Sequence, residues 1–138
     1  MSYAVSGAVQ AAVYQRLAGD AALAALVGDA VFDNPPAGAL PALFVQIGAE
    51  EGRDVSGQGA ALLQLDLVVA VRGEDTGFAA VKAAAGAVSG ALEEAPLALA
   101  VGRLVSLRLA RARARAGVGG ARRREVLLIF RALVEAGD

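Results

Sequence analysis

The hydrophobic positions in the first part of the chain recur with the spacing of an α-helix. Four aliphatic residues follow one another every four positions: Val5, Val9, Val13 and Leu17. This spacing places them on one side and predicts a helix over residues 3–18. Gly19 ends this segment, and Asp20 can cap a second short helix over residues 21–27. The expected buried residues of the second helix are Leu23, Leu26 and Val27.

Strand-like patterns replace the helical spacing in the middle of the chain. Residues 42–48 form a short apolar run after Pro41 and predict a strand. In residues 61–72 every second position carries an aliphatic side chain: Leu63, Leu65, Leu67, Val69 and Val71. This alternation is typical of a strand with one buried face. The segment between them, residues 50–59, is polar and acidic, and predicts a flexible loop at the tip of a hairpin.

A third helix is predicted to begin at Asp75 or Thr76 and to stop before Pro96. Its apolar residues follow 3-4-3-4 spacing: Phe78, Val81, Ala85, Val88 and Leu92. The order of elements is helix, short helix, two strands, helix, two strands. This order predicts a single α+β domain over residues 1–138. The expected architecture is a four-stranded, mainly antiparallel sheet with helices packed on one face and a long C-terminal β-hairpin.

The predicted C-terminal hairpin has arms at residues 103–115 and 122–134, joined by a glycine-rich turn. Each thirteen-residue arm would extend roughly 40 Å, about the width of a compact domain of this size, so the tip is expected to project. A turn centred on Val118-Gly119 would pair Arg115 with Arg122. In that register three arginines of the first arm, Arg111, Arg113 and Arg115, continue the face of Val105, Leu107 and Leu109, and a shift of one residue would break the pattern.

Charge is distributed unevenly along the chain. Residues 1–102 hold four basic and eleven acidic side chains, whereas residues 103–138 hold nine basic and three acidic ones. Such a chain can attract copies of itself head to tail. Within residues 103–131 the only acid is Glu125. Because like charges facing each other across a strand pair are destabilising, the hairpin is expected to need an acidic partner.

These observations predict a subunit or tail interface. Its expected basic residues are Arg111, Arg113, Arg115, Arg122, Arg123 and Arg124, and its expected acidic residues are Glu50, Glu51 and Asp54. Two alternatives remain open. The arginines can be a solvated edge that limits pairing with other sheets. They can also form a nucleic-acid-binding module, in which the hairpin contacts phosphates and binding falls steeply with salt.

The composition argues against an enzyme. The chain has no His and no Cys, which excludes imidazole bases, Cys nucleophiles, disulfides and thiolate metal sites. No serine has a lysine three residues later, and the glycine-rich turn lacks the Gly-Lys-Ser/Thr of a phosphate-binding loop. We expect no cofactor, no metal and no catalytic residue. The apolar runs are broken well short of about 20 residues, so we expect no membrane span.

Several segments carry a resemblance to a known family. They are Ala11-Ala12-Val13-Tyr14-Gln15-Arg16-Leu17, Val31-Phe32-Asp33-Asn34-Pro35, Pro41-Ala42-Leu43-Phe44-Val45-Gln46-Ile47-Gly48 and Gly102-Arg103-Leu104-Val105-Ser106-Leu107. By their order and pattern, nearly the whole chain resembles small tail-completion proteins of long-tailed phages. Its alanine- and arginine-rich style is similar to the version found in the phage-like gene transfer agents of high-GC bacteria.

The resemblance implies a tail terminator. Such a protein is assembled in the bacterial cytoplasm and forms a homo-hexameric ring at the head-proximal end of the tail tube. The ring stops tube growth, meets the tail tube protein and the head-tail connector protein, and lets DNA pass non-specifically through its bore. The family has no catalytic residues to carry over.

Overall fold

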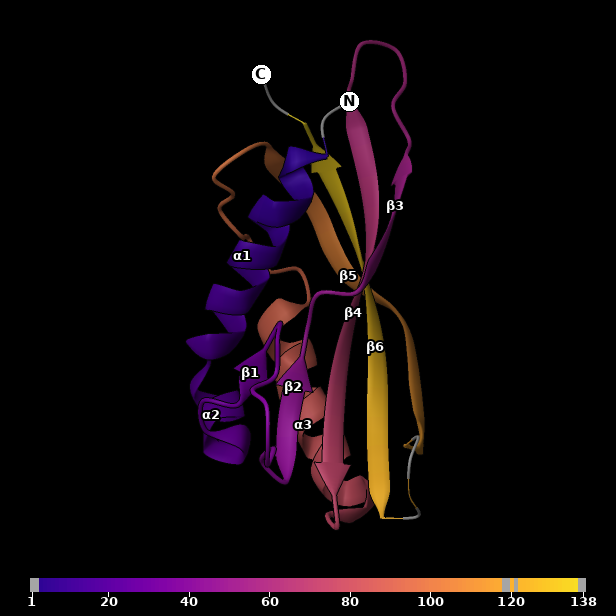
Figure 1. Cartoon of the computed structure of the whole chain (residues 1–138). Helices are drawn as coiled ribbons and strands as arrows, with labels where there is room; N and C mark the ends of the chain where they lie inside the picture. The colour runs from indigo at the N-terminus through magenta and orange to yellow at the C-terminus, as the bar shows by residue number, and fades with distance from the viewer. Residues whose placement is uncertain (1–2, 118–119, 121, 137–138) are drawn as a thin grey trace.

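The computed structural model describes residues 3–117, 120 and 122–136, which form a sheet with helices on one face (Figure 1). The helices are α1 (Ala4–Ala18), α2 (Ala21–Val27) and α3 (Gly77–Leu92). The strands are β1 (Val31–Phe32), β2 (Leu43–Gln46), β3 (Glu50–Asp54), β4 (Leu62–Glu74), β5 (Arg103–Ala116) and β6 (Arg123–Glu135). The three predicted helices and the four predicted strands are therefore present as α1, α2, α3, β2, β4, β5 and β6.

The helices bury the faces that their spacing predicts, with two exceptions. α1 buries Val5, Val9, Val13 and Leu17 against the sheet, and the Asp20 carboxylate accepts the backbone N–H of Leu23 at 2.9 Å. Leu26, expected in the core, is 44% exposed because only Leu23 and Val27 of α2 turn inward. Phe78 is 38% exposed because it lies at the first turn of α3, and its ring contacts cationic side chains instead.

The predicted four-stranded sheet is wrong in number, because two short strands extend it. The described strands follow the order β1-β2-β4-β6-β5, and β3 pairs with β4 on the β2 side. β2 covers only the Leu43↔Gly73 to Gln46↔Ala70 part of that β4 edge. Residues 50–54, predicted as a flexible loop, pair with the rest of it, from Glu50↔Leu67 to Asp54↔Leu63. β3 thus supplies the backbone partners that the short β2 leaves unmet along β4.

The hairpin does not project from the domain as predicted. β6 pairs with β4 along its entire length, from Leu62↔Glu135 to Glu74↔Arg123. β4 itself has 13 residues, so it matches the long arms and the molecule is elongated along the strands (Figure 1). The expectation assumed a molecule of similar width in all directions, and the pairing of three long strands removes that assumption.

The predicted register of the hairpin is also wrong. Arg115 pairs with Glu125, and Ala116 pairs with Arg124. The ladder of β5 shifts between Leu104 and Ser106 and again between Leu109 and Arg111. The second shift is a β-bulge at Ala110, which inserts one extra residue and reverses the faces of the strand beyond it.

This bulge decides where the arginines point. Leu109 pairs with the buried Phe130 on the helix-covered face, whereas Arg111 pairs with Ile129 on the opposite face. Since paired residues share a face, Arg111, Arg113 and Arg115 lie on the helix-free face of the sheet, and Ala112 and Ala114 lie on the helix side. The expected continuation of the Leu107 face by arginines is therefore reversed.

The core fills the space between the helices and one sheet face. Its largest fully buried side chain is Phe130 of β6, followed by leucines from α1, α2, α3 and β4: Leu17, Leu23, Leu63, Leu65 and Leu92. All five of the alternating β4 residues predicted to face inward are buried. At the open end of the hairpin, Gly102 packs the start of β5 against β6 and α1.

We predict that Gly102→Ala destabilises the fold by about 2–4 kcal/mol. Gly102 has a φ of +77°, and an added Cβ would meet the Glu135 carbonyl oxygen at 2.6 Å and Val5 Cγ1 at 2.8 Å. Gly59→Ala is the matched control, because Gly59 has a φ of +84° with nothing within 4 Å. Its cost should be only the backbone strain, about 1 kcal/mol. Urea unfolding of both variants measures the difference, and equal losses would contradict the packing argument.

Candidate interaction surface

A buried carboxylate on β6 joins the arginines of two neighbouring strands. Glu125 is only 4% exposed. Its Oε2 atom accepts a hydrogen bond from Arg115 Nε of β5 at 2.5 Å, and its Oε1 atom lies 3.3 Å from Arg72 Nε of β4. Arg72 also donates to the Gln46 side chain of β2. Four adjacent strands are thereby linked across the helix-free face by one polar network.

The same network shifts the titration of Glu125. Burial acts to raise the pKa of its carboxyl, but hydrogen bonds from Arg115 and Arg72, with their positive charges, outweigh burial and lower the pKa below its ordinary value of 4.5. Glu125 is therefore ionised at neutral pH. The hairpin's need for an acidic partner is met, for Arg115, within the same chain.

Other hairpin arginines are also engaged internally. Arg131 forms a bidentate contact with Asp66 at 3.0 and 3.2 Å, and this carboxylate raises the pKa of Arg131. Arg103 lies 3.2 Å from Glu135, and Arg122 lies 3.4 Å from Asp75. At the tip, the Arg124 guanidinium lies over the Phe78 ring, 5.2 Å from its centroid. The contacts of Arg122 and Arg124 hold the tip against α3 and the end of β4.

Three exposed arginines of β5 have no ion pair among the described residues. They are Arg108, Arg111 and Arg113, here termed the edge arginines. Their partners in the ladder are Arg131, Ile129 and Leu127, so all three lie on the helix-free face. β5 is the last strand in the sheet order, which places them along an outer edge of the molecule.

The predicted acidic residues lie at the other side of the sheet. Glu50, Glu51 and Asp54 belong to β3, and together with Asp33, which follows β1, they form the acidic edge. Glu50 accepts hydrogen bonds from the hydroxyls of Tyr3 and Ser6, the latter at 2.6 Å. Hydrogen bonds from Ser56, including its backbone N–H at 2.9 Å, lower the pKa of Asp54.

The structure therefore divides the nine predicted interface residues between separate places. Arg111 and Arg113 are edge arginines, and Arg115 is bound to Glu125. Arg122, Arg123 and Arg124 lie at the hairpin tip, and Glu50, Glu51 and Asp54 lie on the acidic edge. Within one subunit the basic and acidic members of the predicted interface do not meet. Whether they form an interface between subunits remains a prediction.

Sequence reasoning missed the β4 residues that form ion pairs with the hairpin. Arg72 and Asp66 lie on β4, more than fifty residues from their partners, and no local pattern links them. Glu125 did give a signal, since it is the single acid in a basic segment. A buried acid needs nearby cations. The predicted register pairs Arg115 with Arg122, whereas in the structure Arg115 pairs with Glu125.

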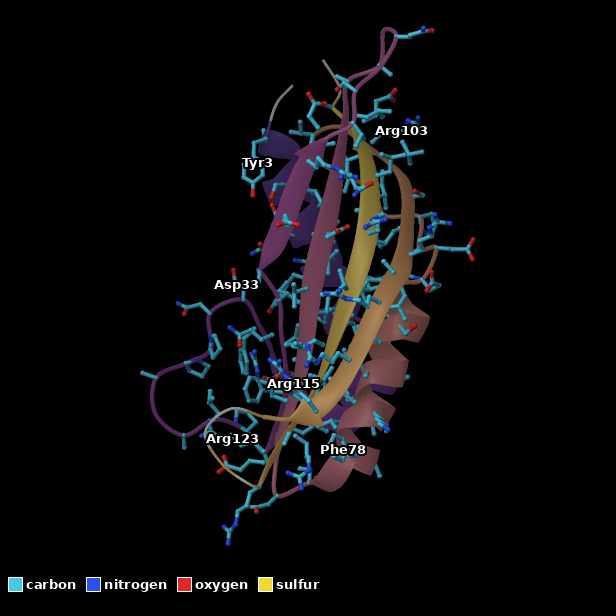
Figure 2. All side chains as sticks on the ribbon, turned by 90° about the vertical axis from the view of Figure 1, so that its right-hand side faces the viewer. Tyr3, Asp33, Phe78, Arg103, Arg115 and Arg123 are labelled. Atoms are coloured by element: carbon cyan, nitrogen blue, oxygen red, sulfur yellow. The ribbon has the colours of Figure 1, made fainter. Side chains whose placement is uncertain are left out.

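The helix-free face also carries apolar side chains. Figure 2 turns this face of the sheet toward the viewer. Its half-buried residues, beside the edge arginines, are Val68, Leu127, Ile129 and Leu133. Near the hairpin tip, a hollow of about 210 Å³ is lined by the start of β2 and by Glu125, Arg72 and Arg115.

Among the described residues no group of His, Cys, Asp or Glu side chains could hold a metal ion. None of the described helices is long and apolar enough to cross a membrane.

We predict that Glu125→Gln destabilises the protein by about 1–3 kcal/mol at pH 7. This is less than the 3–5 kcal/mol of a fully buried pair, because Arg72 and Arg115 are 39% and 40% exposed. A lowered folded-state pKa stabilises the fold above the unfolded pKa, and this contribution is lost as pH falls through the lowered value. The gap between wild type and variant should therefore shrink below pH 4.5, the ordinary pKa.

Urea unfolding at several pH values between 7 and 3 measures this gap. Glu135→Gln serves as the control, because its partner Arg103 is 66% exposed and the pair should contribute less than about 1 kcal/mol. A Glu125→Gln gap that stays constant with pH would show that the charge of Glu125 is not what stabilises the hairpin.

Comparison with known proteins identifies the fold. No curated protein sequence was found to match the chain. A solved structure of a chain from the virion of a native gene transfer agent particle is 51% identical, with a TM-score of 0.92 over 98% of this chain and 100% of that one. The family model described as tail completion protein gp17 matches residues 11–135. The chain therefore belongs to the tail completion protein family and is a structural protein of phage-like tails.

Proposed function

We propose that this protein forms a homo-hexameric ring that terminates the tail tube of a phage-like particle and joins it to the head connector. In this proposal one face of the ring contacts the tail tube protein and the other contacts the head-tail connector protein. DNA passes non-specifically through the bore. The observation that carries the proposal is the likeness, over 98% of this chain and 100% of the other, to a chain of a gene transfer agent virion.

The distribution of charge supports contacts between copies. Basic and acidic residues that lie apart within one subunit occupy opposite sides of the sheet. The edge arginines lie on β5, and the acidic edge lies on β3 and just after β1. Two different surfaces that attract each other form a head-to-tail contact, and such contacts close into a ring when the rotation between subunits permits it. The half-buried apolar residues of the helix-free face offer a further surface to be covered.

We also propose that the role is structural and not enzymatic. The sequence has no His or Cys. The buried Glu125 is held by two arginines, and no described residue beside it is a nucleophile, so its position suits a structural ion pair better than acid–base chemistry.

A nucleic-acid-binding role is the second candidate. The observation in its favour is the line of three edge arginines, which have no carboxylate partner among the described residues. Cations in this arrangement can contact phosphates, and each contact would add about one unit to the salt dependence of binding. The two functions are compatible if the edge arginines face the bore.

We predict that particles contain six copies of this protein per tail. Quantitative mass spectrometry of purified particles, calibrated against a labelled copy of the chain, measures this ratio. Particles produced without the gene should contain heads and tails that are not joined, with tails of irregular length, in electron micrographs. The gene re-expressed in the same cells is the control. Joined particles of normal tail length in its absence would reject the proposed function.

A further inference from the structure

A groove on the side of the sheet away from β5 has no role in the network described above. It lies between α1 and the end of β1, and its volume is about 390 Å³. Its polar lining comes from Gln10, Tyr14, Gln15 and Asp33, with Ile47 at its apolar side. We propose that this groove binds the guanidinium groups of the edge arginines Arg111 and Arg113 of a second copy of the chain. The inference rests on the proposed ring and specifies its subunit contact.

The groove has the chemistry that recognises a guanidinium group. Gln10 Nε2 donates a hydrogen bond to Asp33 Oδ2 at 3.1 Å, which fixes the carboxylate and leaves its Oδ1 atom without a bond among the described residues. The Tyr14 side chain, 38% exposed, lines the same groove. A carboxylate pairs with the fork of an arginine, and an aromatic face stacks on its plane, so both features favour arginine over a simple point charge.

The positions of the two surfaces fit a ring. β1 and β5 are the two ends of the sheet order, and Figure 2 shows Asp33 at the side of the molecule away from β5. The edge arginines therefore cannot reach the groove of their own subunit. A contact between opposite sides of successive subunits is the kind that repeats around a closed ring.

The surroundings of the groove favour a protein partner over DNA. Glu50, Glu51 and Asp54 of the acidic edge lie beyond it on the same side of the sheet, with Arg53 as the one base of β3. This side would repel phosphates and attract the edge arginines. Arginine–carboxylate pairs at subunit contacts also give specificity, because a partner with either charge reversed would place like charges together.

Charge exchange tests the proposal. Asp33→Arg should weaken ring association at least about tenfold, as should Arg111→Glu combined with Arg113→Glu. All three substitutions in one chain should restore association, because the attraction is re-formed with opposite signs. Association is measured by analytical ultracentrifugation of the full chain and by incorporation into particles. Lys82→Glu, an exposed charge reversal on α3, is the control and should leave association unchanged. Thermal unfolding shows that each variant is folded.

Cysteine cross-linking gives a second measurement, since the natural chain has no Cys. Gln15→Cys combined with Arg113→Cys should form disulfides between copies in assembled particles, and either substitution alone should not. If wild-type particles contain rings but neither charge exchange nor cross-linking has these effects, the groove is not the contact and the proposed function stands. Rings of normal strength that lose salt-dependent DNA retention on loss of Arg111 and Arg113 would instead assign these residues to the DNA path.

Discussion

The structure depends on the ion pairs that Glu125 makes with Arg115 and Arg72. The three side chains lie in one row across β5, β6 and β4, so a buried negative charge separates two arginines of neighbouring strands. Without that carboxylate, Arg72 and Arg115 would lie on either side of β6 with no negative charge between them, and the hairpin would be less stable near its turn. With it, β6 can lie in the interior of the sheet while β5 remains strongly basic. Glu125 thus allows β5, which carries the edge arginines, to pair stably with β6.

The β-bulge at Ala110 gives this basic edge its direction. Before the bulge, β5 turns Leu107 and Leu109 toward the helices, and after it the strand turns arginines away from them. A strand with regular alternation would have turned Arg111 and Arg113 to the helix side of the sheet, where Ala112 and Ala114 lie instead. Bulges and charges are also devices that keep an edge strand from pairing with other sheets. The arginines of β5 thus avoid indiscriminate pairing while remaining available for a specific acidic partner.

The likeness to a gene transfer agent virion subunit places this fold among proteins that work as parts of an assembly. In that setting the surfaces matter more than any cavity. The subunit has a helix layer, a helix-free sheet face with half-buried apolar residues, a basic edge and an acidic edge. Such a division by side is not visible in a net charge of −1. A nearly neutral chain can therefore present strongly charged surfaces of both signs to other proteins.

The sequence by itself determined the helices, β4, the long hairpin and the family, because each rests on local periodicity or on the order of segments. Val5 to Leu17 and Leu63 to Val71 bury the faces that their spacing requires. The tertiary structure alone decided the rest. The acidic residues 50–54 have no strand pattern of their own, and they form β3 because they pair with the free edge of β4. The bulge at Ala110 reversed the arginine face, and the pairs Arg72–Glu125 and Arg131–Asp66 join residues far apart in the chain. Register and long-range ion pairs depend on which strands become neighbours, and local sequence does not encode that choice.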